Sequence, residues 1–159
     1  DEFLRGPWIA RLACLKPDGA PYVVPVWYHW DGDAFWVVPR ARSEWALYMA
    51  RDPRVSLVVD EPEPPIRKVL CEGKAVVVEE PVGPILDNGE KSVWNKLGEE
   101  HTGPRYLGDK AAEYRGSVNV EPCWTFKIVP EKITTWQGFG WHKRYFHPEL
   151  HEKDGGGER

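Results

Sequence analysis

The chain has 159 residues, of which 42% are hydrophobic and 29% are charged, a balance typical of one soluble globular domain. Its formal net charge is -4 and no tract of clustered Lys and Arg appears, which argues against a nucleic-acid partner. No apolar stretch reaches about 18 residues, so we expect no membrane-spanning segment.

The cysteines indicate a reducing compartment. Cys14, Cys71 and Cys123 are odd in number, widely spaced and free of any C-x-x-C motif, so they predict buried thiols instead of a disulfide framework or a zinc site. The opening residues Asp1–Arg5 lack the apolar core of a signal peptide. We therefore expect a cytoplasmic protein.

Two strands are predicted at the start of the chain. Residues 8–16 alternate between two faces, and Pro17-Asp18-Gly19 turns the chain back into an apolar run at 21–30. Pro25 has no N–H to donate within that second strand. It predicts either a simple edge strand or a bulge or opening, against which a ligand could lie.

A hairpin and a helix follow. Asp31-Gly32-Asp33 separates the run at 21–30 from a third strand at 34–39, which is a strong hairpin signal. Ser43 is a good N-cap, and the apolar residues after it fall at helical spacing until Asp52-Pro53 ends the helix. The next strand is predicted at 55–59.

The helix start carries a candidate anion site. Arg40 and Arg42 would share one face of an extended segment directly before the N-cap Ser43. Unpaired N–H groups and the helix dipole favour negative charge at such a point, and guanidinium groups match phosphate oxygens. The alternative is an ordinary N-cap with two solvated arginines.

The second half of the chain returns to strands after a different segment. A long strand is expected at 66–79, with Gly73 marking a bulge, and two short helices around 90–115. Further strands are expected at 121–129, 131–137 and 143–146, and a disordered tail at 148–159. Six or seven antiparallel strands with one helix after the third fit a small barrel in a single domain at 1–147.

No set of catalytic side chains stands out. The chain has no G-x-S-x-G, H-E-x-x-H or Walker motif and no obvious pair of catalytic carboxylates. His29, at the end of the second strand, is the best candidate for a functional imidazole, although a lone histidine is more often structural. An enzyme without reactive groups of its own suggests a borrowed cofactor.

Three segments of the chain resemble a known family. The run ARLACLKPDGAPYVVPVWYHWDGDAFWVVPRARS, the helix leading to RDPRVSLVV, and IRKVLCEGKAVVVEE have the order and spacing of the pyridoxamine 5'-phosphate oxidase-like, FMN-binding split-barrel superfamily, in its flavin and deazaflavin-dependent oxidoreductase branch. The resemblance implies a mainly β, Greek-key-like antiparallel split barrel, an obligate homodimer, and FMN or a deazaflavin coenzyme bound at the dimer interface.

The resemblance also assigns residues to the cofactor. It implies a phosphate held at Arg40, Arg42 and Ser43, and a ring lying along the two preceding strands at Val24, Pro25, Val26, Val38 and Pro39. It implies that Lys68 reaches the polar edge of the flavin from the partner subunit, and that Trp136 and Trp141 stack over the ring or a flat substrate. The alternative for the two tryptophans is packing in the core or at the dimer interface. Trp45 stands where the family commonly has a basic phosphate ligand, so one charge contact is missing.

Three functions follow from the resemblance. The first is a flavin-dependent oxidoreductase that moves hydride to or from a flat conjugated small molecule of the quinone, tetrapyrrole or nitroaromatic class. The second is a binding or carrier protein for flavin or haem without turnover. The third is a family member without cofactor, kept for a structural or regulatory role, which the tryptophan at position 45 favours slightly.

Overall fold

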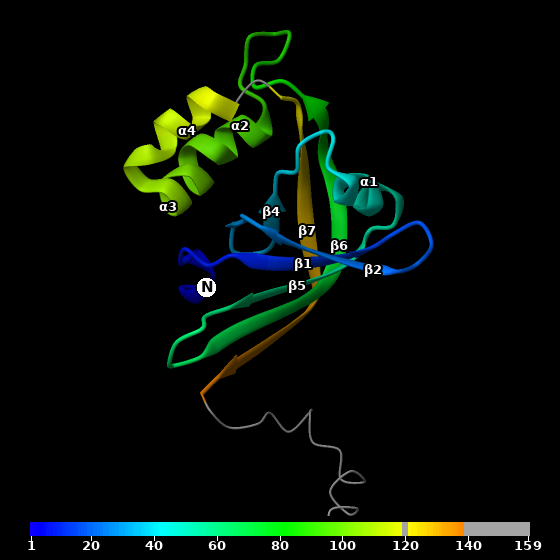
Figure 1. Cartoon of the computed structure of the whole chain (residues 1–159), viewed down its shortest axis with the longest axis vertical. Coiled ribbons are helices and arrows are strands. Elements are labelled where there is room, and N and C mark those ends of the chain that lie inside the picture. Colours follow the sequence, from blue (N-terminus) through cyan, green and yellow to red (C-terminus); the bar gives the residue numbers. More distant parts are fainter. Residues whose placement is uncertain (119–120, 139–159) are drawn as a thin grey trace, which may run out of the picture.

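The structure of the protein is a computed structural model that describes residues 1–118 and 121–138. Within these ranges, seven antiparallel strands form one sheet in the order β2-β1-β5-β6-β7-β4-β3 (Figure 1). The strands are β1 (Ala10–Leu15), β2 (Pro21–Val26), β3 (His29–Trp30), β4 (Phe35–Val37), β5 (Arg54–Asp60), β6 (Arg67–Val82) and β7 (Cys123–Gln137). The mainly β fold and the open sheet confirm the predicted split barrel.

The opening of the barrel lies between β2 and β3. These two strands are the edges of the sheet, yet only Trp27 and Tyr28 separate them in the chain. Three peptide steps span at most about 11 Å, so the sheet curls until its edges nearly meet. The prediction of one continuous strand over 21–30 is therefore wrong. The alternatives predicted from Pro25 are both met, because β2 is an edge strand and also borders the opening.

The hairpin predicted at Asp31-Gly32-Asp33 is confirmed. His29 pairs with Trp36 and Trp30 with Phe35 across it. The Asp31 carboxylate accepts the N–H groups of Asp33 and Ala34, and Gly32 takes a positive φ of 111° that suits a residue without a side chain. The turn chemistry thus fixes the register of β3 and β4.

Strands β6 and β7 form the longest ladder of the sheet. The two strands predicted at 121–129 and 131–137 are one strand, because Pro130 lies at a bulge where no ladder donor is required. Opposite it, Gly73 marks the predicted bulge, and a Cβ there would clash with the carbonyl oxygen of Val129. The strand predicted at 143–146 and the tail at 148–159 lie outside the described residues.

Short helices complete the described fold (Figure 1). A 3-10 turn covers Phe3–Arg5, and α1 (Glu44–Arg51) follows the Ser43 N-cap as predicted. Between β6 and β7 the chain forms α2 (Val93–Leu97), a π-helical turn (Gly98–Thr102), α3 (Gly103–Leu107), a 3-10 turn (Gly108–Lys110) and α4 (Ala111–Val118). This is more helix than the two short helices predicted, because the glycines fall at the joints between short pieces. We call residues 83–118 the helical segment.

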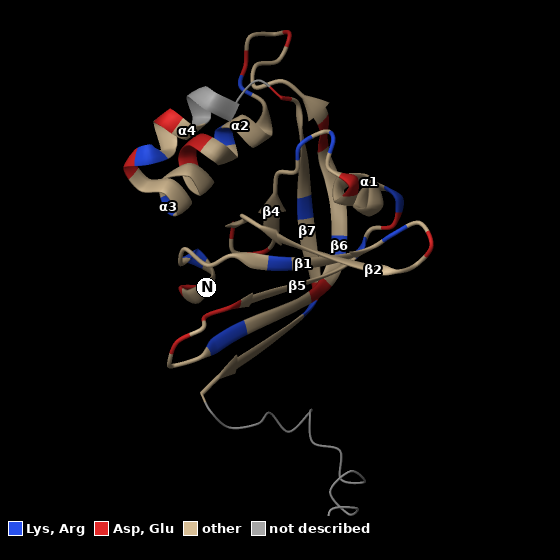
Figure 2. Ribbon diagram, in the orientation of Figure 1, with Lys and Arg blue, Asp and Glu red and all other residues tan. Residues whose placement is uncertain are grey.

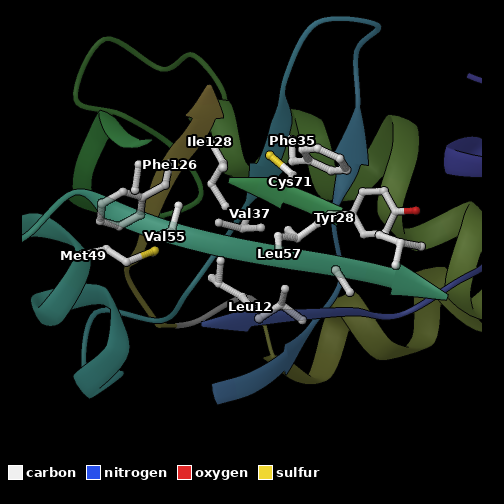
Figure 3. Packing of buried hydrophobic residues seen from close by; sticks show 14 of the residues in the cluster. Leu12, Tyr28, Phe35, Val37, Met49, Val55, Leu57, Cys71, Phe126 and Ile128 are labelled. Carbon is white, nitrogen blue, oxygen red and sulfur yellow. The ribbon is translucent and has the colours of Figure 1, made fainter. Parts of the chain in front are cut away.

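The barrel interior is filled by apolar side chains that alternate along the strands (Figure 3). Leu12, Phe35, Leu57 and Phe126 have almost no exposed surface, and each such side chain contributes about 1.5–3 kcal/mol to folding. All three cysteines are free and buried, as predicted. In the described part of the chain, no helix is long and apolar enough to cross a bilayer.

Candidate functional site

Two arginines precede the N-terminus of α1. The loop that enters α1 contains two basic residues (blue segments of the ribbon in Figure 2), Arg40 and Arg42. Ser43 is the N-cap residue, as predicted, but its side chain makes no capping hydrogen bond. The hydroxyl group is therefore not used in capping, and the loop has the donor groups of an anion site.

Glu121 pairs with both arginines, and we call Arg40, Arg42, Ser43 and Glu121 the arginine corner. Its carboxylate lies 3.2 Å from the Nη2 atom of Arg42 and 3.6 Å from the Nη1 atom of Arg40. The adjoining backbone is tied to the arginine loop, since Ala41 N–H donates to the carbonyl of Pro122 at 2.8 Å and Trp124 N–H donates to that of Pro39 at 2.9 Å. An internal carboxylate thus partly neutralises the two guanidinium groups.

A cavity of about 360 Å³ opens beside the corner, between the mouth of the barrel and the helical segment. Among the described residues, four of the nine tryptophans of the chain line it, namely Trp27, Trp36, Trp45 and Trp94. Its other walls are Pro25, Val26, His29, Val38, Arg40, Asn95, Leu97, Gly98, Thr102, Gly103, Leu107, Tyr114 and Cys123. Flat indole faces suit a planar conjugated ligand.

The cavity gathers some of the residues predicted to hold a cofactor. Pro25, Val26, Val38, Arg40 and Trp45 line it. Trp45, which replaces a basic residue common in the resembled family, thus forms a wall of the cavity. The remaining predicted residues of this group are Val24, whose side chain packs on the core; Pro39, which is fully buried; and Arg42 and Ser43, which stay in the adjacent loop.

Lys68 and Trp136 are not in this cavity. They are cross-strand neighbours near the end of the β6–β7 ladder, and the Lys68 ammonium lies 4.1 Å from the centre of the Trp136 ring. Neither residue lines the cavity of the same chain, so their predicted contact with a cofactor requires a second subunit. Trp141 lies outside the described residues.

His29 forms part of the wall between two hollows. It lines the tryptophan-rich cavity and also a second hollow of about 570 Å³ on its other side. Its ring stacks on His101 of the π-helical turn, with ring centres 3.8 Å apart. Burial and the nearby His101 lower the pKa of His29, which keeps the imidazole neutral at pH 7.

Arg105 and Tyr106 of α3 fasten the helical segment to the opening of the barrel. The Arg105 guanidinium donates to the carbonyl oxygens of Leu4, Gly6 and Tyr28, and it stacks on the Tyr28 ring at 4.5 Å. The Tyr106 hydroxyl donates to the Trp8 carbonyl at 2.9 Å. These side chains satisfy backbone groups that lack strand partners at the opening.

The cavity residues of the helical segment were not predicted. Trp94, Asn95, Leu97 and Tyr114 reach the cavity only because α2 to α4 fold back over the barrel mouth. The one signal available in the sequence was the unusual number of tryptophans, which indicated either a thick core or an aromatic pocket. The structure assigns four of them to the pocket.

The site fits an anionic, planar cofactor. The guanidinium pair supplies charge, the Ser43 hydroxyl supplies a further polar group, and the adjacent indoles supply stacking surface.

The sequence matches the family described as Pyridoxamine 5'-phosphate oxidase over residues 1–136. No curated protein matches the chain in sequence. A conserved hypothetical protein from Mycobacterium tuberculosis has a similar structure, with a TM-score of 0.64 and 26% identity, over 86% of this chain and 81% of that one.

Two other solved structures share the fold at lower identity. An F420 reductase aligns with a TM-score of 0.59 and 21% identity, over 84% of this chain and 94% of its own. The haem storage protein HutZ from Vibrio cholerae aligns with a TM-score of 0.60 and 17% identity, over 87% of this chain and 92% of its own. The same barrel thus occurs in proteins with different ligands.

Proposed function

Because the chain belongs to the pyridoxamine 5'-phosphate oxidase family, we propose that it binds a flavin and acts as an oxidoreductase on flat conjugated small molecules. The observation that carries this proposal is the junction of the arginine corner with the tryptophan-lined cavity, since Arg40 and Trp45 line that cavity. Such a junction suits a molecule that is anionic at one end and planar at the other. FMN and the deazaflavin coenzyme both have this form.

The residues of the chain have distinct roles in this proposal. Arg40, Arg42 and Ser43 hold the phosphate, and the indoles of Trp27, Trp36 and Trp45 contact flat rings and exclude water. A bound flavin supplies hydride chemistry that no side chain of the protein provides. The substrate classes are quinones, tetrapyrroles and nitroaromatics. The free buried thiols suit a cytoplasmic protein.

We also propose that the protein is a homodimer with the flavin at its interface. Lys68 and Trp136 lie away from the cavity of their own chain, so only a second copy brings them to it. The outward face of β2 offers an apolar surface for this contact, because Val23 is 63% exposed and Pro25 is also exposed. Sedimentation equilibrium is expected to give twice the mass of the chain.

Titration with FMN and with the deazaflavin coenzyme tests the cofactor. We expect Arg42→Ala to weaken binding about tenfold, because it removes one charge-assisted contact to the phosphate. Arg54→Ala is the matched control, since Arg54 is an exposed arginine paired with Asp52 beyond the other end of α1. Equal affinity of Arg42→Ala and the unaltered protein would refute the phosphate assignment.

A carrier of flavin or haem without turnover is the alternative function. The neutral imidazole of His29 at the wall of the cavity favours it, because such a group is suited to ligate haem iron. Mixing the flavin-loaded protein with a reduced nicotinamide and a quinone separates the two functions. Oxidation faster than with free flavin supports the enzyme, and a haem spectrum that changes in His29→Ala supports the carrier.

A further inference from the structure

Glu121 lowers the net positive charge of the arginine corner. Its carboxylate pairs with Arg42 at 3.2 Å and with Arg40 at 3.6 Å, and about two thirds of its side chain is shielded from water at 35% exposure. Backbone hydrogen bonds from Ala41 to Pro122 and from Trp124 to Pro39 hold its segment against the arginine loop. The carboxylate is therefore a fixed part of the corner.

The charges at the corner leave a small positive excess. Two guanidinium groups face one carboxylate, Glu121, which gives a net charge of one positive unit. This count covers the three ion-paired side chains. Glu44 adds a further formal negative charge at the start of α1, but its carboxylate lies along the helix, where it accepts a hydrogen bond from the Tyr48 hydroxyl. A phosphomonoester such as that of FMN carries about -1.5 to -2 charges near pH 7, whereas a phosphodiester carries only one.

We propose that Glu121 adapts this corner to a singly charged phosphodiester and weakens binding of the doubly charged phosphomonoester. Repulsion between a phosphate and the carboxylate grows with the product of their charges. It therefore weakens the binding of FMN more than the binding of a singly charged phosphodiester. The deazaflavin coenzyme presents a phosphodiester, whereas FMN presents a phosphomonoester. The inference rests on the proposed flavin site and selects among its cofactors.

Three flavins that share one ring test the proposal. They are riboflavin without phosphate, FMN, and the methyl ester of FMN, whose phosphate carries a single charge. Equilibrium dialysis gives their affinities for the unaltered protein and for Glu121→Gln. We expect FMN to bind Glu121→Gln about three- to tenfold more tightly, the methyl ester to gain about the square root of that factor, and riboflavin to be unchanged.

Two further variants serve as controls. Glu121→Asp keeps the charge and is expected to retain the relative affinities of the unaltered protein. Glu90→Gln removes one charge from the exposed loop before α2 and is expected to leave all three affinities unchanged. Circular dichroism establishes that each variant is folded before its affinities are compared.

The outcomes separate this inference from the proposed function. If Glu121→Gln shifts FMN and its methyl ester by the same factor, or shifts neither, the assignment of Glu121 is wrong while the flavin site stands. If none of the three flavins binds any variant, the flavin site itself is refuted and the assignment of Glu121 is refuted with it.

Discussion

The barrel and the helical segment form opposite walls of one cavity, but different forces hold them. The barrel interior is one apolar cluster with members from every strand (Figure 3). Backbone hydrogen bonds join neighbouring strands around it. In the helical segment, by contrast, Trp94 and Leu97 are the buried large apolar side chains among the described residues. Its attachment depends on a few contacts: Arg105, Tyr106 and Glu79 form hydrogen bonds, and Trp27 stacks on Tyr106 with ring centres 5.0 Å apart.

This difference implies that the two walls have unequal stability. Burial of apolar surface is spread over many residues, so the barrel is expected to unfold only as a whole. A segment held by a few hydrogen bonds can detach at a lower free energy than global unfolding. The arginine corner belongs to the stable wall, and the cover of the cavity belongs to the less stable one.

Removing a core ring is the strongest way to break the stable wall. Phe126→Ala is expected to lower the free energy of unfolding by about 3–5 kcal/mol, because Phe126 is completely buried in the barrel. Val129→Ala, on the same strand but 42% exposed, serves as the control and should cost much less. Urea unfolding measures both. A loss confined to the helical segment would contradict the single cooperative barrel.

Arg105→Met is expected to detach the helical segment while the barrel remains folded. The variant loses the charge-assisted hydrogen bonds to Gly6 and Tyr28, which corresponds to about 1.5–3 kcal/mol in the free energy of docking. Hydrogen exchange should show faster exchange at 93–118 and unchanged protection of β5 and β6. Arg54→Met, in an exposed ion pair, should alter neither. Uniform loss of protection would mean that the two walls unfold together.

Glu79→Gln tests the N-terminal attachment of α2. The Glu79 carboxylate accepts the N–H of Val93 at 3.1 Å and the hydroxyl of Thr125 at 3.2 Å, so it caps the helix and joins it to β7. We expect a loss of about 1 kcal/mol, visible as faster exchange at 93–97. Glu80→Gln changes the exposed neighbouring residue and should have no effect. An equal response in both variants would remove Glu79 from the set of anchors.

The smallest expected effect is on pH dependence. Burial and His101 lower the pKa of His29 from 6.5, with Arg5 and Arg105 acting in the same direction and Asp31 against them. The undocked state therefore binds the proton more readily, so docking is fully stable above about pH 6.5 and weakens as the pH falls below it. Protection factors at 98–107, which correct for the intrinsic pH dependence of amide exchange, should fall as the pH is lowered from about 7.5 to about 5.5, and His29→Phe should flatten this response. An identical pH response in both proteins would exclude His29 as the cause.

Local sequence signals predicted the elements whose causes are local. The Asp31-Gly32 turn, the Ser43 N-cap, the edge strand with Pro25 and the bulge at Gly73 each follow from the backbone preferences of a few neighbouring residues. The arginine corner was predicted for the same reason. Its partner Glu121 was not, because nearly 80 residues separate them and only the path of β7 brings them together.

Elements that depend on closure of the barrel were not predictable in this way. The break at Trp27 and Tyr28 interrupts an apolar run that looks like one strand, and it arises because the sheet edges must meet there. Pro130 predicts a break between two strands, but the long pairing of β7 with β6 continues through a bulge. The helical segment contains glycines that normally disfavour helices, and contacts with the barrel compensate for them.

The four indoles of the cavity give the protein a built-in optical reporter. Trp27, Trp36, Trp45 and Trp94 emit in the near ultraviolet, where flavins and haem absorb. Energy transfer to a flavin or haem bound in the cavity would quench this emission strongly. Trp8, Trp30 and Trp124, which lie at other positions, would retain more of their emission. Occupancy of the cavity is therefore measurable from the intrinsic fluorescence of the native chain, without a label or an assay of turnover.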